Sequence, residues 1–176
     1  SSESDTFYEF GSGSCLNIVT LAQNTNKKLF FATDWVDSSI EIMNCIGANA
    51  KSLGFENHKF NGMKFDFFNP DYALKLKPGS VALTFGSLEQ VGTNFDKLIE
   101  YFLAQNDITF VHIECFTELY DRNNLFSEMG YRYDFDRNYL NGYFNALKSL
   151  EAQNKIVMSK EVRLMGSAYH DGWIHV

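Results

Sequence analysis

The sequence predicts an α/β fold: an open, mostly parallel seven-stranded sheet with helices on both faces and an antiparallel final strand. Short apolar runs alternate along the chain with amphipathic stretches of helical periodicity, the order of elements that builds a parallel sheet. Two short runs separated by a polar loop close the chain, and such a pair is typical of an antiparallel edge. The expected strands are Thr6–Phe10, Lys28–Ala32, His58–Phe65, Ser80–Phe85, Asp107–Cys115, Lys155–Met165 and Gly172–Val176.

Four amphipathic stretches supply the expected helices. In the second of them Ile40, Met43 and Ile46 recur at helical spacing, and Gly54 follows as a stop signal. Because connections between parallel strands are right-handed, the strand-to-helix loops of such a sheet lie along one edge, where these folds bind ligands. The expected helices are Cys15–Gln23, Ser38–Leu53, Asn94–Gln105 and Asp136–Gln153.

Length and composition indicate a single domain over residues 1–176, with ample apolar surface for a core. Cys15, Cys45 and Cys115 lie far apart and lack metal-ligand spacing, so we expect reduced, buried thiols in a cytoplasmic protein. No run approaches the ~20 apolar residues of a membrane helix, so no membrane partner is expected. A net charge of -7 disfavours a nucleic-acid partner.

The most specific pattern is a glycine turn directly after the first apolar run. Gly11 and Gly13 occupy the turn, and Asp34 ends the second apolar run 21 residues beyond Gly13. Strand, glycine turn, helix, strand and acid form the unit that holds the adenosine half of a cofactor, with the acid accepting from ribose hydroxyls. A purely structural turn is the alternative, which the spacing of Asp34 disfavours.

Two residues near the turn indicate which cofactor it holds. A dinucleotide fingerprint places Gly or Ala five positions after its first glycine, where this chain has Leu16. Glu9, two residues before Gly11, would set a carboxylate beside the charges of a pyrophosphate, whereas it suits a cofactor that is positively charged there. A nicotinamide-dependent oxidoreductase is therefore disfavoured.

This turn resembles motif I of the class I S-adenosylmethionine-dependent methyltransferases, an acid followed by alternating glycines, with Cys15 in place of the last glycine. Asp34–Ser39 resembles motif II, Lys64–Phe68 the acidic end of the third strand, and Leu76–Phe85 the approach to the fourth. The resemblance implies a Rossmann-like fold and S-adenosylmethionine as cofactor. The residues that it implies for cofactor binding are Glu9, Gly11, Ser12, Gly13, Asp34, Trp35, Ser39, Asp66 and Phe67.

Three later segments, Ser87–Gly92, His112–Glu114 and Asn138–Tyr143, resemble a bacterial subgroup of sugar or small-molecule O-methyltransferases. That resemblance implies methyl transfer to a hydroxyl of a small molecule, such as a sugar or sugar-linked phosphate compound of polysaccharide biosynthesis. A catalytically inactive nucleoside-binding or scaffold domain is the alternative, because Cys15 departs from the motif. The first strand follows directly after Ser1–Asp5, so we expect the chain to lack an N-terminal lid segment, and a homodimer is left open.

Methyl transfer to an alcohol needs alignment and a base, for which three residues are candidates. Glu89 follows the fourth strand, Glu114 ends the fifth, and His170 lies between the last two. The alternative for Glu89 is an ordinary surface charge, and for His170 a turn residue. His112, one pair deeper than Glu114 on its strand, is more typical of a hydrogen-bonded core histidine.

The long connection Phe116–Phe135 is expected to contribute to acceptor binding, because connections of this length are usually functional. Tyr120 within it, and Arg137 and Tyr139 just after it, would orient the acceptor, the arginine by binding an anionic group. Solvated surface charge is the alternative for the arginine. No spacing of His, Cys, Asp or Glu typical of a metal site occurs, so no metal is expected.

Overall fold

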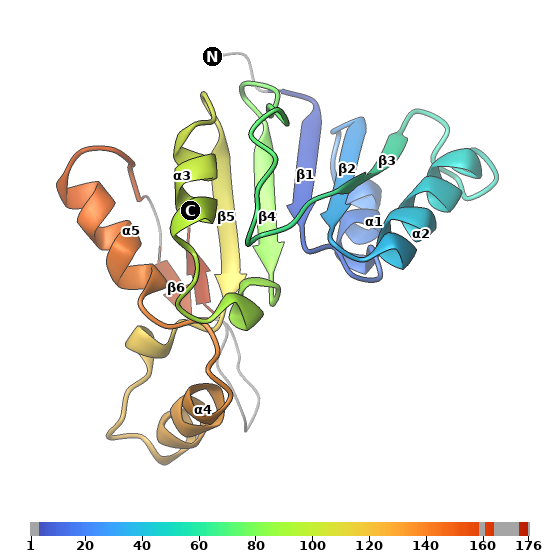
Figure 1. Ribbon diagram of the computed structural model, residues 1–176. Helices are drawn as coiled ribbons and strands as arrows, with labels where there is room; N and C mark the ends of the chain where they lie inside the picture. The colour runs from blue at the N-terminus through green and yellow to red at the C-terminus, as the bar shows by residue number, and fades with distance from the viewer. Residues whose placement is uncertain (1–3, 159–160, 164–172, 176) are drawn as a thin grey trace.

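The computed structural model describes residues 4–158, 161–163 and 173–175, and the side chains of the last two ranges are not described. Within these residues, seven strands form one sheet in the order β3-β2-β1-β4-β5-β7-β6, flanked by helices (Figure 1). The predicted α/β class with a parallel sheet between helices is confirmed. The strands are β1 (Thr6–Phe10), β2 (Leu29–Asp34), β3 (Lys59–Lys64), β4 (Val81–Phe85), β5 (Thr109–Glu114), β6 (Glu161–Arg163) and β7 (Trp173–His175).

Strands β1 to β5 are parallel, and β1 is the middle one of these five. Its Tyr8 is in register with Phe31 of β2 and Ala82 of β4. β7 pairs with β5 in the antiparallel direction, and β6 pairs with β7 in the same way. The strand order reverses between β1 and β4, because the chain leads outward from β1 to β3 and then returns to β4. Open α/β sheets bind ligands at such a reversal, outside the carboxyl ends of the strands.

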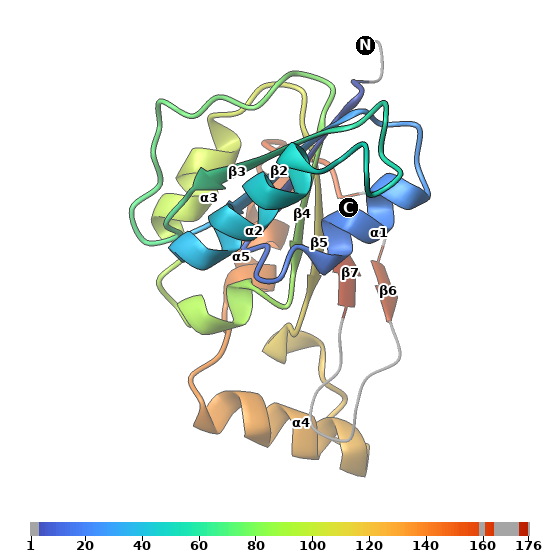
Figure 2. The ribbon, with the colours of Figure 1, turned by 90° about the vertical axis from the view of Figure 1, so that its right-hand side faces the viewer.

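The helices cover both faces of the sheet: α1 and α2 pack in one core and α3 and α5 in the other, and Figure 2 shows α1 and α3 on opposite sides of β4 and β5. Side chains of β1 alternate between the two faces, so that Phe7 packs in the core beneath α1 and α2 and Tyr8 in the core beneath α3 and α5. No helix among the described residues is long and apolar enough to cross a membrane. The helices are α1 (Leu16–Gln23), α2 (Asp37–Ala48), η1 (Leu88–Val91), α3 (Asp96–Leu103), η2 (Thr117–Leu119), α4 (Leu125–Asp136) and α5 (Tyr143–Ala152).

The helix expected over Asp136–Gln153 is confirmed from Tyr143 onward and is wrong in its first part, because α4 ends at Asp136 and α5 begins only at Tyr143. Asn138 (φ 54°) and Gly142 (φ 90°) adopt left-handed backbone, which a continuous right-handed helix does not contain. The side chain of Asn124 caps α4 by accepting from two backbone amides of its first turn. Because η2 and most of α4 lie within it, much of the expected loop Phe116–Phe135 is helical.

The strand expected over Lys155–Met165 is also wrong in its first part, because residues 155–158 are not in a strand. The backbone amide of Lys155 donates to the Leu150 carbonyl at 3.0 Å, and that of Met158 donates to the Glu151 carboxylate at 3.3 Å. These bonds hold the segment against the end of α5, so that its backbone groups are used there and not in a sheet.

The insertion between β5 and α5 places α4 beyond the carboxyl ends of the strands, below the arrowheads in Figure 1. The Tyr120 hydroxyl after η2 donates to Oδ2 of Asp134 in α4 at 2.6 Å, and both side chains are buried. A short hydrogen bond to a buried carboxylate is among the stronger ones, so this contact fastens α4 to the edge of the domain.

Candidate functional site

The turn between β1 and α1 is built from backbone that glycine adopts without strain. Gly11 (φ 71°) and Gly13 (φ 49°) are both left-handed, and the Gly11 amide donates to the Thr33 carbonyl at 2.8 Å. A Cβ on Gly11 would lie 2.4 Å from the Cβ of Ser87, whereas one on Gly13 would meet no described atom within 4 Å. Gly11 therefore permits the loop after β4 to pack against the turn, and Gly13 borders open space.

Asp34 ends β2 and is hydrogen-bonded to this turn. Its Oδ2 accepts from the backbone amide of Gly13 at 2.8 Å, and its Oδ1 accepts from that of Val36 at 3.0 Å. Because a carboxylate has about four acceptor positions, both oxygens can still accept from ligand hydroxyls. Trp35, which is 69% exposed, follows directly. The structure thus brings the acid and the glycine turn together, as their spacing indicated.

Glu9 is buried one residue before the end of β1, and it is only 1% exposed. Its Oε1 accepts from the Asn17 side-chain amide at 2.9 Å, whereas its Oε2 has no hydrogen-bond partner among the described residues. Burial raises the pKa of Glu9 to about 7, although Asn17 and the backbone amide of Ile18 oppose the rise. An unsatisfied buried acceptor costs about 1–3 kcal/mol, so this oxygen suits a ligand that brings a donor or a positive charge to the turn.

Cys15 occupies the position of the last motif glycine and adopts the left-handed backbone that a glycine would favour (φ 62°). Its side chain is fully buried, and its Sγ lies 3.5 Å from the carbonyl oxygen of Ser39 in α2. Ser12 also approaches this sulfur, with its Oγ at 3.9 Å. The cysteine is thus accommodated by packing between the turn and α2, and Ser39 contacts the turn through it.

Asp66 and Phe67 follow β3 at the same edge of the sheet. Oδ1 of Asp66 accepts from the backbone amide of Phe68 at 2.8 Å, which shapes the turn after β3. The Phe67 ring approaches the glycine turn, because its Cζ is 3.3 Å from where a Cβ on Gly11 would lie. Phe67 therefore provides apolar surface next to Gly11.

Glu114 ends β5 and holds the loop that follows β4. Its Oε1 accepts from the backbone amide of Ser87 and its Oε2 from that of Leu88, both at 3.2 Å. The side chain is 1% exposed, and burial raises its pKa to about 7 against the opposing effect of these hydrogen bonds. Both carboxylate oxygens are therefore engaged in positioning the backbone at the tip of β4.

Glu89 lies in η1 and has Tyr139 as a neighbour across the same edge. Burial and the nearby Glu89 carboxylate together raise the pKa of the Tyr139 hydroxyl. The Tyr139 ring packs edge-on against Tyr133 of α4 with a centroid separation of 6.3 Å, and the Arg137 guanidinium lies 3.6 Å above the Tyr133 ring. The structure thus gathers an acid, two tyrosines and an arginine between η1 and the end of α4.

Of three other residues considered from the sequence, Tyr120 differs from its predicted role in orienting the acceptor. The Tyr120 hydroxyl is engaged with Asp134 inside the α4 insertion. His112 is confirmed as a hydrogen-bonded core histidine, since it is buried and its Nδ1 lies 2.8 Å from the Thr84 hydroxyl. His170 lies outside the described residues.

Two residues of the site were missed from the sequence. Asn17 supplies the hydrogen bond to Glu9, and its only signal was its place in the first turn of the helix after the glycines. Ser87 packs against Gly11, and its hydroxyl donates to the Phe10 carbonyl at 2.9 Å, which links the tips of β4 and β1. A polar residue directly after β4 was the available signal.

The fold and this site define a class of protein: a doubly wound, mostly parallel sheet with a glycine turn at the strand-order reversal and an acid preceding that turn. Protein-family models and curated proteins give no match to the sequence. Among the solved structures that the chain resembles are three methyltransferases and an enzyme of a pericyclic reaction.

An S-adenosylmethionine-dependent methyltransferase from Aquifex aeolicus is similar over 99% of this chain and 83% of its own, at 13% identity and a TM-score of 0.56. A geranyl diphosphate methyltransferase in complex with GPP and sinefungin covers 99% and 71%, at 11% identity and a TM-score of 0.61. Magnesium protoporphyrin IX methyltransferase from Synechocystis PCC 6803, with bound SAM, covers 98% and 69%, at 12% identity and a TM-score of 0.61. At these identities the likeness shows that this chain shares their fold.

Proposed function

We propose that this chain binds S-adenosylmethionine at the carboxyl edge of its sheet and directs methyl transfer to a hydroxyl of a small molecule. The observation that carries the proposal is Glu9, a buried carboxylate next to the glycine turn whose Oε2 lacks a hydrogen-bond partner among the described residues. S-adenosylmethionine carries an ammonium and a sulfonium and no phosphate, so its charge suits this carboxylate. The shared fold with methyltransferases that use this cofactor supports the same assignment.

Five described residues divide the cofactor between them in this proposal. Glu9 binds the ammonium, Asp34 accepts from the ribose hydroxyls, and Gly13 leaves room for close approach. Phe67 and the exposed Trp35 offer apolar surface to the adenine. The cofactor supplies an activated methyl group, so the chain needs mainly to align it with the acceptor oxygen.

On the acceptor side, Glu89 is the proposed base, and Arg137 and Tyr139 orient the acceptor. Their support is the proximity of the Glu89 carboxylate to Tyr139 and the position of Arg137 beside the same group of aromatic rings. An acceptor that is a sugar or a sugar-linked phosphate would pair its anion with Arg137. His170 stays a second candidate base. Glu114 acts as a positioning residue for the loop after β4.

Calorimetric titration with S-adenosylhomocysteine tests the cofactor assignment. We expect Asp34→Ala to weaken binding about tenfold or more, because it leaves the ribose hydroxyls unpaired. Asp37→Ala is the matched control, since Asp37 lies three residues further on and its side chain is 80% exposed. Folded protein that gives no heat with millimolar S-adenosylhomocysteine would contradict the proposal.

Turnover tests the reaction. With labelled S-adenosylmethionine and a panel of sugars and sugar phosphates, Glu89→Gln should lower kcat while the affinity for S-adenosylhomocysteine stays at the wild-type value. Loss of a general base typically costs about 10²–10⁴-fold in rate. An unchanged kcat would remove Glu89 from the base role.

A second candidate function is nucleoside binding without catalysis, as in a scaffold domain. One observation favours it: Glu114, an expected base, has both carboxylate oxygens occupied by backbone amides. This function predicts tight binding of S-adenosylhomocysteine together with no methyl transfer to any hydroxyl acceptor of the panel.

A further inference from the structure

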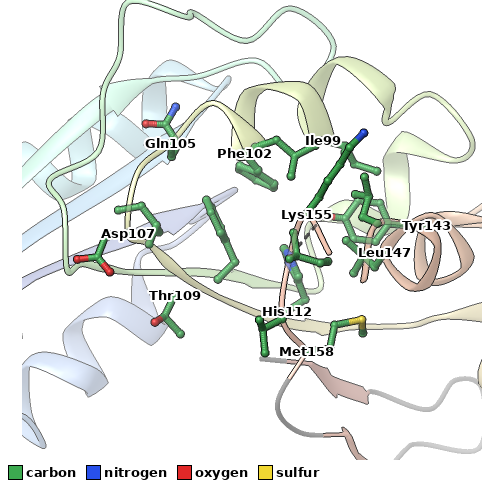
Figure 3. Close-up of a pocket in the computed structure, with 16 residues that line it drawn as sticks. Ile99, Phe102, Gln105, Asp107, Thr109, His112, Tyr143, Leu147, Lys155 and Met158 are labelled. Atoms are coloured by element: carbon green, nitrogen blue, oxygen red, sulfur yellow. Dashed lines mark hydrogen bonds between the residues drawn. The ribbon is translucent and has the colours of Figure 1, made fainter. Parts of the chain in front are cut away.

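A cavity of about 430 Å³ lies on the face of the sheet that α3 and α5 cover (Figure 3). Its inner wall includes the buried side chains of Phe102, His112 and Tyr143, whereas Leu103 and Val157 are exposed at its mouth. Protein interiors are close-packed, and voids larger than a water molecule are few. This volume falls within the range of about 300–1,000 Å³ that is typical of small-molecule sites.

The polar groups of the inner wall are already hydrogen-bonded within the protein. Nε2 of His112 lies 3.4 Å from the Tyr143 hydroxyl, and its Nδ1 pairs with Thr84. The Gln105 side chain accepts from one backbone amide and donates to the Tyr101 carbonyl at 3.1 Å. The interior therefore presents mainly apolar surface, which a ligand would fill with an apolar body.

The cavity lining includes one basic residue, Lys155, and one acidic residue, Asp107, which lie apart from each other. Figure 3 shows Lys155 beside Leu147 and Tyr143, while Asp107 lies with Gln105 toward the opposite end of the cavity. Lys155 is exposed, and no ion pair joins it to a carboxylate among the described residues. A ligand with a negative group would therefore place that group at Lys155 and away from Asp107.

We propose that this cavity is a second ligand site, for a small molecule with an aromatic or otherwise flat apolar body and one anionic group that pairs with Lys155. The site shares none of its lining residues with the proposed cofactor site at the carboxyl edge. It therefore stands or falls independently of the proposed methyl transfer.

Two fluorescent probes of matched shape test the site. Anilinonaphthalene sulfonate has an apolar ring system with an anion, and phenylnaphthylamine has the same rings without the anion. We expect both to bind the full chain, and Lys155→Ala to weaken the sulfonate about threefold while leaving the neutral probe unchanged, as for an exposed ion pair. Equal effects on the two probes would overturn the role of Lys155.

A second experiment tests the ligand site by filling the cavity with a larger side chain. Leu147→Trp places a large ring in the cavity and should weaken both probes about tenfold, whereas Asn145→Trp, on an exposed position of the same helix, should not. Leu103→Trp, which would block the cavity at its mouth from α3, replaces Leu147→Trp if the latter does not fold. Circular dichroism and a cooperative urea-unfolding transition identify folded variants. Probe binding that folded cavity-filling variants leave unchanged would place the probes elsewhere and overturn the proposal.

Discussion

Replacing Glu9 by glutamine keeps the shape of the side chain and its acceptor for Asn17 but removes the buried charge. In the folded protein, burial raises the pKa of Glu9 from 4.5 to about 7. Folding therefore favours the protonated form of Glu9. Its contribution to the free energy of unfolding is most favourable below pH ~4.5, the ordinary pKa, and declines as pH rises to ~7, the pKa in the folded protein. The glutamine variant lacks this decline.

The size of the effect follows from the shift in pKa. A rise from 4.5 to about 7 corresponds to about 3 kcal/mol, at ~1.36 kcal/mol for each pH unit. Because part of this effect is already present at pH 5, the difference in unfolding free energy between Glu9→Gln and wild type should grow by about 2.5 kcal/mol between pH 5 and pH 8, in favour of the variant. Taking the difference cancels other titrating groups, including Glu114.

Urea unfolding at pH 5 and pH 8 measures this difference, with linear extrapolation to water. Glu41→Gln is the control, because Glu41 is exposed on α2 and its variant should follow wild type at both pH values. In calorimetry, Glu9→Gln should bind S-adenosylhomocysteine about ten- to a hundredfold more weakly, since a hydrogen bond to a charged group contributes ~1.5–3 kcal/mol. A stability difference that is the same at both pH values would refute the account of the buried charge, and unchanged affinity would refute its role in the site.

Three further changes test the packing around the site. Gly11→Ala should lower the free energy of unfolding by about 2 kcal/mol, because the new Cβ would lie 2.4 Å from Ser87 on left-handed backbone; a variant as stable as wild type in urea unfolding would show that the loop yields. Glu114→Ala should cost about 3 kcal/mol in the same assay, since two backbone amides lose their buried acceptor, and a cost near zero would mean that water replaces it. Tyr120→Phe removes the buried hydrogen bond to a carboxylate of α4 and should cost about 1–3 kcal/mol, seen in thermal unfolding and as faster hydrogen exchange in α4; unchanged exchange would contradict this anchoring role.

The parallel strands and the glycine turn were predictable because their signals are local. The side chains of Phe7 and Tyr8 in β1 point to opposite cores. Because both faces of the strand are buried, the sequence shows a short apolar run next to the glycines. Gly11 and Gly13 adopt the left-handed backbone for which glycine is suited. Asp34 lies beside them because the chain must cross one helix before it reaches the neighbouring parallel strand.

The break between α4 and α5 was not predictable in the same way. Apolar side chains continue at near-helical spacing through it, whereas Asn138 takes up left-handed backbone and contacts Gly92 in the loop after η1. That contact joins segments far apart in the sequence, and periodicity within one segment carries no information about it.

Sequence alone determined the class of fold and the group Glu9, Gly11, Gly13 and Asp34, since backbone conformation, alternation and short crossovers are properties of neighbouring residues. Only the tertiary structure decided what each buried polar group pairs with. In the structure, two backbone amides after β4 donate to the Glu114 carboxylate, whereas Oε2 of Glu9 has no hydrogen-bond partner among the described residues. The physical reason is that the free energy of a buried carboxylate depends on donors and solvent brought to it from distant parts of the chain.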